Sequence, residues 1–133
     1  MDLTEADLNV SCGSERWMRH WFNQNIILSL GVQHIMGKGL AWLIDAIASH
    51  EAMTAPLKAR CESDRSFDFL HFWTLNVDLD TQKAVLTCRA DSDLPAIVTQ
   101  KIPFTDCPLA EVKVYAGNDG PDTARKIYMP SEY

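Results

Sequence analysis

The stretch "SFDFLHFWTLNVDLDTQKAVLTCRADSD", residues 66–93, predicts two antiparallel strands joined by a tight polar turn. In the first strand, residues 69–78, side chains on one face alternate with those on the other, as in a half-buried strand. His71 lies on the same face as Trp73 and Leu75. The turn is "DLDTQK", and "AVLTCRA", residues 84–90, returns as the second strand. This hairpin indicates a sheet with one apolar face.

Three further strands follow the hairpin in the sequence. They are 96–104, 111–116 and 124–130, separated by short segments rich in Pro, Gly, Asn and Asp. One helix precedes them: residues 39–51 carry Leu40, Leu43, Ile44 and Ile47 at helical spacing on one face. The order predicts an α+β fold in a single domain, residues 1–133. We expect an antiparallel β-meander of about five strands, with one main helix on one face and short N-terminal helices.

The remaining segments give weaker predictions. Residues 3–9 predict a short helix capped by Thr4, and residues 14–22 predict another, with Trp17 and Trp21 on one face. Residues 25–37 predict two short strands, or one strand broken at Gly31. Residues 52–66 are polar and contain Pro56, which favours a helix end followed by a loop.

Composition limits the partners that we expect. The chain has 133 residues, with 12 Lys and Arg against 18 Asp and Glu, giving a net charge of −6. Without a visible basic patch, such a surface repels phosphates, so we expect no direct binding to nucleic acid. The apolar stretch 39–48 is too short to span a membrane, which needs about 20 residues. The sequence shows no export signal and no CxxC spacing, so we expect a cytoplasmic protein with four reduced thiols.

Two candidates for catalysis arise from the sequence. His71 is a candidate general base, but no carboxylate partner is visible beside it, which favours a structural histidine. Cys12, near Ser14, Glu15 and His20, is a candidate nucleophile. Its spacing matches no known nucleophile motif, and Ser14 and Glu15 are equally typical of a helix N-terminus. We therefore assign no catalytic residue from the sequence.

Metal and cofactor sites are also not indicated. The four histidines are far apart in the sequence and form no HExxH or HxH pair, so we assign no metal ligand and no cofactor. The aromatic residues are more numerous than one helix packed on a sheet requires, and exposed aromatics concentrate at protein interfaces. We expect an interaction surface that includes Trp17, Trp21, Phe72 and Trp73.

Several phrases together resemble a family of small bacterial proteins known only as a domain of unknown function. They are "GSERWMRH" (13–20), "AWLIDAIASH" (41–50), "FWTLNV" (72–77), "AVLTC" (84–88), "IPFTDCPL" (102–109) and "MPSEY" (129–133). Met129 stands where the family pattern has leucine. The resemblance covers roughly residues 11–133. It implies a bacterial, mobile-element or phage origin, and it transfers no activity to any residue.

Two functions remain open from the sequence. The first is a non-catalytic accessory or inhibitor protein that binds a protein partner, such as an antagonist of host defence of the anti-CRISPR kind. Its acidic charge suits a basic partner and an on-rate that salt lowers. The second is a small hydrolase or transferase that uses Cys12 or a histidine. The oligomeric state is left open, with a homodimer among the alternatives.

Overall fold

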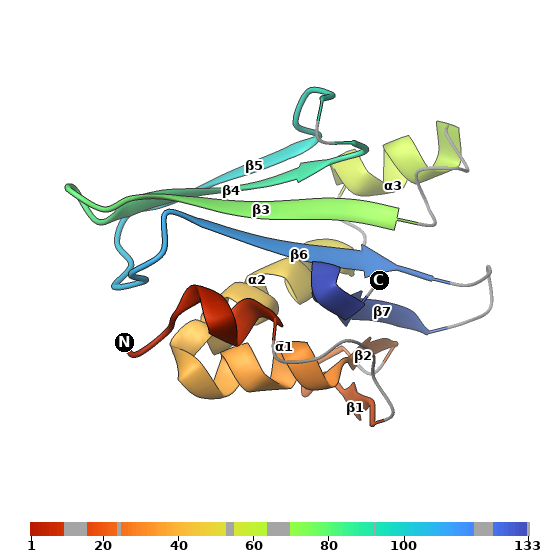
Figure 1. Cartoon of the computed structure of the whole chain (residues 1–133). Coiled ribbons are helices and arrows are strands. Elements are labelled where there is room, and N and C mark those ends of the chain that lie inside the picture. The colour runs from red at the N-terminus through yellow and green to blue at the C-terminus, as the bar shows by residue number, and fades with distance from the viewer. Residues whose placement is uncertain are drawn as a thin grey trace.

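The structure is a computed structural model, and it describes residues 1–9, 16–23, 25–52, 55–63, 70–91, 93–118 and 124–132. Its centre is one sheet, with helices α1 and α2 beneath it in the view of Figure 1. The described strands are β1 (Met18–Arg19), β2 (Ile26–Leu28), β3 (Leu70–Asp78), β4 (Lys83–Arg89), β5 (Val98–Ile102), β6 (Glu111–Gly117) and β7 (Arg125–Tyr128). The α+β class is therefore confirmed.

The sheet is more elaborate than the predicted meander. Its strand order is β1-β2-β7-β6-β3-β4-β5, so seven strands replace the expected five or so. β3, β4 and β5 form a meander, but β6 crosses back to pair with β3, with Trp73 opposite Val114. The four strands thus form a Greek key. β7 pairs with β6, and β2 then pairs with β7 in parallel, with Leu28 opposite Ile127.

The hairpin β3–β4 follows its sequence pattern closely. The described odd-numbered residues of β3 from His71 to Val77 are buried, and the even-numbered residues are at least partly exposed. The side chain of Asp78 accepts hydrogen bonds from the backbone N–H groups of Asp80 and Thr81, which shapes the turn. Gln82 completes it with a φ of 59°. One face of the sheet is therefore inner and the other outer.

The main helix, α2 (Ala41–Glu51), covers the inner face (Figure 1). Leu40, Leu43, Ile44 and Ile47 are all fully buried, as the sequence predicts. A π-helical turn, η2 (Met36–Leu40), connects it to α1 (Leu30–Ile35). Gly39, with a φ of 114°, permits the kink between them.

Three local predictions were wrong. Residues 52–66 contain a helix, α3 (Ala55–Ser63), which packs through the buried Leu57. The described part of 14–22 is not a helix, because Met18–Arg19 pairs with β2 as strand β1. Residues 25–37 contain one strand, β2, instead of two. Their second half forms α1, because the Ser29 side chain accepts a hydrogen bond from Val32 N–H and so caps a helix. The 3–9 helix is present as the short helix η1 (Glu5–Asn9).

Among the described helices, none has both the length and the apolar composition that crossing a membrane requires.

Candidate functional site

A buried polar cluster lies where the last turn of α2 meets the inner face of the sheet. Glu51, at the end of α2, has a fully buried carboxylate. Its Oε1 lies 2.6 Å from Nδ1 of His71 and accepts a 2.9 Å hydrogen bond from the indole N–H of Trp73. Its Oε2 lies 3.4 Å from Nε of Arg125 on β7. Three donors from three positions therefore stabilise one buried carboxylate.

The expectation that His71 lacks an acidic partner was wrong. The partner, Glu51, lies twenty residues earlier on a different element, so local sequence does not show it. His71 is fully buried, as a structural histidine would be. An ionised carboxylate only accepts hydrogen bonds, so the Glu51 contact places a hydrogen on Nδ1. In the neutral ring, the lone pair is then on Nε2.

The Nε2 atom of His71 faces a thiol. Sγ of Cys61, in the last turn of α3, lies 3.6 Å from it. Cys61 is partly exposed, whereas His71 and Glu51 are buried. The three residues form a chain of thiol, imidazole and carboxylate, an arrangement that is typical of an activated nucleophile. Sequence reasoning did not select Cys61, because nothing in "KARCES" distinguishes it from a helix-surface residue.

The other cysteines differ from Cys61. Cys88 and Cys107 are free and buried. Burial raises the pKa of the Cys88 thiol, and the Glu51 carboxylate raises it further. Burial likewise raises the pKa of Cys107. The candidate nucleophile Cys12, with Ser14 and Glu15, lies outside the described residues.

A second polar cluster joins β1 to α2. Nε2 of His20 lies 2.7 Å from Oδ1 of Asp45, and the same oxygen accepts a 3.0 Å hydrogen bond from the indole N–H of Trp21. Nδ1 of His20 accepts longer hydrogen bonds from the backbone N–H groups of Phe22 and Asn23. His20 is buried, and it holds the segment after β1 against α2.

The segment around β1 exposes apolar side chains. Its exposed apolar residues are Trp17, Met18, Trp21 and Phe22, which we call the β1 edge surface. Trp21 is 73% exposed, although its indole is hydrogen bonded to Asp45. The rings of Trp21 and Phe22 meet edge to face at 5.0 Å. Exposed apolar residues of this density are typical of a contact with another molecule.

The predicted interaction surface is only partly available to solvent. Trp73 is 1% exposed because it lies on the inner face, where its indole N–H donates a hydrogen bond to Glu51. The prediction that Trp73 belongs to an interaction surface was therefore wrong. Phe72 points to the outer face. Its ring contacts Tyr115 at 5.0 Å, and Tyr115 contacts Tyr128 at 5.8 Å. A row of aromatic rings therefore crosses β3, β6 and β7.

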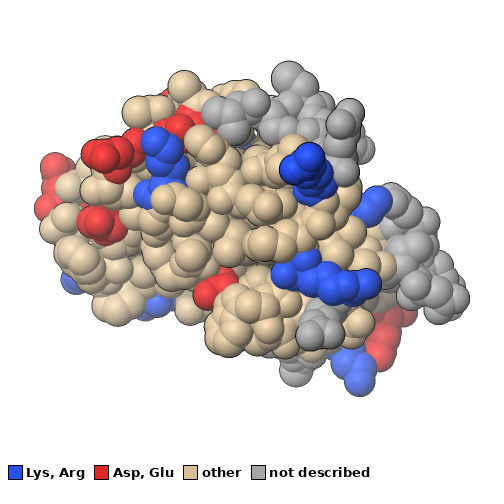
Figure 2. Space-filling model, turned by 90° about the horizontal axis from the view of Figure 1, so that it is seen from below, with Lys and Arg blue, Asp and Glu red and all other residues tan. Residues whose placement is uncertain are grey.

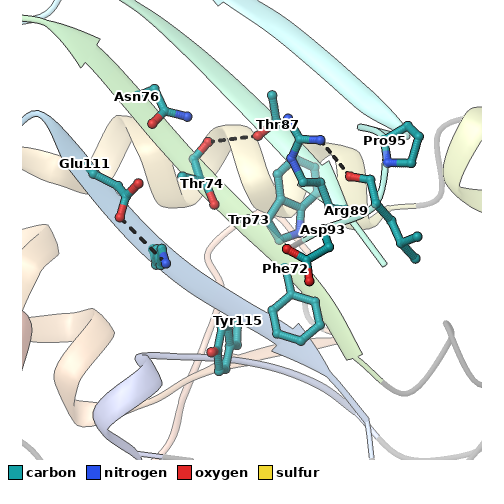
Figure 3. Close-up of a pocket in the computed structure, with 12 residues that line it drawn as sticks. Phe72, Trp73, Thr74, Asn76, Thr87, Arg89, Asp93, Pro95, Glu111 and Tyr115 are labelled. Atoms are coloured by element: carbon teal, nitrogen blue, oxygen red, sulfur yellow. Dashed lines mark hydrogen bonds and ion pairs between the residues drawn. The ribbon is translucent and has the colours of Figure 1, made fainter. Parts of the chain in front are cut away.

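The same row borders a groove on the outer face. The groove has a volume of about 690 Å³, and Phe72, Tyr115 and Arg89 are among the residues that line it. Figure 3 shows Phe72 and Tyr115 side by side. Arg89 donates to the carbonyl oxygen of Leu94, which fixes the loop after β4 over the groove. At the other end of the row, Lys126, which shares the outer face with Tyr128, lies 5.5 Å from the ring centre of Trp17.

Charge is distributed unevenly around these features. Figure 2, which views the molecule from below, shows a face that is mostly uncharged, with charged groups scattered around it. The exposed residues Arg16 and Arg19 flank Trp17 and Met18 in the sequence. Asp45, the described acidic residue in contact with this segment, already accepts two hydrogen bonds. Basic side chains therefore lie beside the β1 edge surface in a chain of net charge −6.

Comparison with known proteins identifies the class of the chain but no activity. Residues 2–133 match the model of a family of unknown function, DUF6876. The chain belongs to that family, which confirms the resemblance to a domain of unknown function. No curated protein and no solved structure matches it.

Proposed function

We propose that the protein is an accessory or inhibitor that binds a partner protein through the β1 edge surface, and that this binding itself involves no catalysis. The observation that carries this proposal is the concentration of exposed Trp17, Met18, Trp21 and Phe22 in six consecutive residues. Large rigid aromatic side chains supply much of the contact energy at protein interfaces. A mobile-element or phage origin, as the family resemblance implies, suits an inhibitor of this kind.

The side chains of the surface and the charge of the chain indicate the chemistry of the partner. Arg16 and Arg19 are exposed next to Trp17 and Met18, and Lys126 lies over the Trp17 ring. The four exposed apolar side chains call for a partner that presents an apolar surface of its own. The net charge of −6 disfavours a partner with a phosphate backbone.

The edge of the sheet gives the surface a fixed shape. β1 is paired with β2, and the backbone N–H of His20 donates to the carbonyl oxygen of Ile26 at 2.9 Å. The hydrogen bonds of His20 and Trp21 to Asp45 attach the same segment to α2. Pre-ordered side chains lose less conformational entropy on binding, which favours affinity.

Site-specific photocrosslinking tests the proposal. A photoreactive phenylalanine analogue replaces Phe22 in the full chain, which is expressed in the cells that naturally carry the gene. The matched control carries the same analogue at Phe104, another exposed phenylalanine, which lies in the segment after β5 and is 63% exposed. We expect one protein adduct from position 22 that Trp17→Ala removes, and none from position 104.

Three outcomes would contradict the proposal. They are equal adducts from both positions, an adduct only to a second copy of the chain, and a nucleic-acid adduct. The variants are first compared with the unmodified chain by circular dichroism, so that loss of folding is distinguished from loss of binding.

A further inference from the structure

The buried polar cluster of Glu51 and His71 is in contact with a thiol, that of Cys61, which a purely structural role of the cluster does not require. Cys61 reaches the imidazole from a separate helix, with Sγ 3.6 Å from Nε2 of His71. A thiol is a poor partner for a core histidine, since it is only a weak hydrogen-bond donor. A thiol paired with a base that is itself held by an acid is, by contrast, the usual arrangement of a cysteine nucleophile.

We propose that Cys61 is a nucleophile that accepts acyl groups from activated esters or thioesters, with His71 as its general base. Glu51 is the positioning residue for His71. This activity goes beyond partner binding and uses neither Cys12 nor the β1 edge surface.

The geometry assigns each proton a position. The Glu51 carboxylate, 2.6 Å from Nδ1, keeps the ring hydrogen on that atom and directs the lone pair of Nε2 toward Sγ. The indole of Trp73 and the guanidinium of Arg125 hold the carboxylate in turn. Because Glu51 and His71 are buried, the carboxylate is shielded from water and interacts strongly with the imidazolium that forms. Of the three residues, Cys61 is the one that is partly exposed, so a substrate would approach from its side.

The reaction proceeds in two balanced steps. His71 Nε2 takes the thiol proton, Sγ bonds to the acyl carbon, and the bond from that carbon to the alcohol or thiol leaving group breaks. The leaving group departs with the proton from His71. Water then attacks the thioester while His71 accepts one of its protons. That proton returns to Sγ as the carboxylic acid leaves, which restores the starting state.

The helix itself does not activate the thiol. Cys61 lies in the last turn of α3, where the helix dipole disfavours an anion. Stabilisation of a thiolate therefore depends on His71. This dependence makes the proposal testable, because exposure alone predicts an ordinary thiol whose reactivity is independent of His71.

The first experiment measures the rate of iodoacetamide alkylation at each cysteine of the full chain between pH 5 and pH 9, read by peptide mass spectrometry. An ordinary thiol with a pKa of about 8.5 loses roughly two hundredfold in rate between pH 9 and pH 6. We expect the alkylation rate of Cys61 to fall about tenfold or less over the same pH range, because the imidazolium stabilises the thiolate. His71→Gln should restore the ordinary profile, and Glu51→Gln should give an intermediate one.

The second experiment uses p-nitrophenyl acetate as the acyl donor. We expect a burst of p-nitrophenol and an acetyl adduct on Cys61, with slow turnover. Cys61→Ser should abolish the burst and His71→Gln should lower its rate by about a hundredfold. Cys12→Ser is the matched thiol control and should leave the burst unchanged.

Three results overturn the proposal. They are an ordinary pH profile for wild-type Cys61, acetylation that is spread over lysines without Cys61, and Cys61 labelling that His71→Gln leaves unchanged in a folded variant. The wild-type pH profile decides the matter even where a buried substitution prevents folding.

Discussion

The hydroxyl of Ser29 donates a 2.6 Å hydrogen bond to Oε1 of Glu132, a residue 103 positions later in the sequence. Ser29 also caps α1 by accepting from Val32 N–H. Glu132 accepts from the backbone N–H groups of Gly31 and Met129 as well. The approach is close: a Cβ at position 31 would lie 2.6 Å from Oε1 of Glu132, so a larger residue there would displace the carboxylate from these hydrogen bonds. Residues 129–132 thus complete the start of α1.

Glu132→Ala should lower the free energy of unfolding by about 1.5–3 kcal/mol, because it removes charge-assisted hydrogen bonds to partly buried donors. Ser29→Ala should cost about 0.5–2 kcal/mol through the lost cap. Urea unfolding of both single variants and the double variant measures the coupling. Glu62→Ala, at an exposed residue of α3, is the control. Strict additivity of the two losses would show that the residues do not act together.

Leu43→Ala should destabilise the protein by about 2–5 kcal/mol, because Leu43 is fully buried between α2 and the sheet and its truncation leaves a cavity. Leu79→Ala, in the β3–β4 turn where the side chain is half exposed, should change stability by about 0.5 kcal/mol or less. Denaturant melts of the two variants give the comparison. Equal losses would mean that α2 does not cover the inner face.

Glu51→Ala should cost about 3–5 kcal/mol, because it leaves His71, Trp73 and Arg125 as buried donors around an empty position. Glu111→Ala is the matched control. That carboxylate pairs with Lys113 at 3.7 Å, but both side chains are 53% exposed, so its loss should cost about 1 kcal/mol at most. Calorimetry of both variants measures the difference. A loss at Glu51 no larger than the one at Glu111 would refute the structural importance of the buried cluster.

Asp7 should titrate at an unusually low pH. The hydrogen bond from His34 lowers the pKa of the Asp7 carboxyl from 3.8 to about 2, with help from the backbone N–H of Thr4 and the charge of Lys38. Between these two pH values the unfolded chain binds more protons than the folded one. The contribution of Asp7 to stability is therefore present above about pH 4 and is lost as the pH falls toward 2.

Carboxyl NMR titration of Asp7 measures this pKa directly. His34→Gln should raise it most, because that hydrogen bond is the largest cause of the shift. Lys38→Ala should raise it least, since the Lys38 ammonium is 4.0 Å away and acts only through its charge. The opposite ranking of the two variants would contradict the assignment.

Much of the fold could be predicted from the sequence because local patterns determine it. The alternation of apolar and polar residues determines which side chains of β3 are buried. The four apolar residues at helical spacing between Leu40 and Ile47 determine the buried face of α2. The return of β6 to pair with β3 could not be predicted, since strand order depends on how the connection 103–110 crosses the sheet. Helix α3 was missed because it has no apolar stripe. Among the residues of α3 whose burial is described, Leu57 is the one in the buried core.

The candidate sites illustrate the same limit. Exposure of Trp17 and Trp21 was expected from their number and type, whereas the burial of Trp73 depends on which strand face meets α2. The contact between Glu51 and His71 joins a helix end to a strand, and Cys61 arrives from a third element. No periodicity in the sequence encodes such a meeting, because each partner satisfies its own local pattern.

The parallel pairing of β2 with β7 has a consequence for how the chain folds during synthesis. Ile26, Ile27 and Leu28 are made early, but their partners Arg125, Lys126 and Ile127 are made about a hundred residues later. β2 can pair early with β1 on one edge, but its other edge stays unpaired, beside exposed aromatic side chains, until translation has passed residue 127. Such delayed pairing slows folding and exposes the nascent chain to aggregation. We expect the segment from Trp17 to Leu28 to be a binding site for ribosome-associated chaperones during that interval.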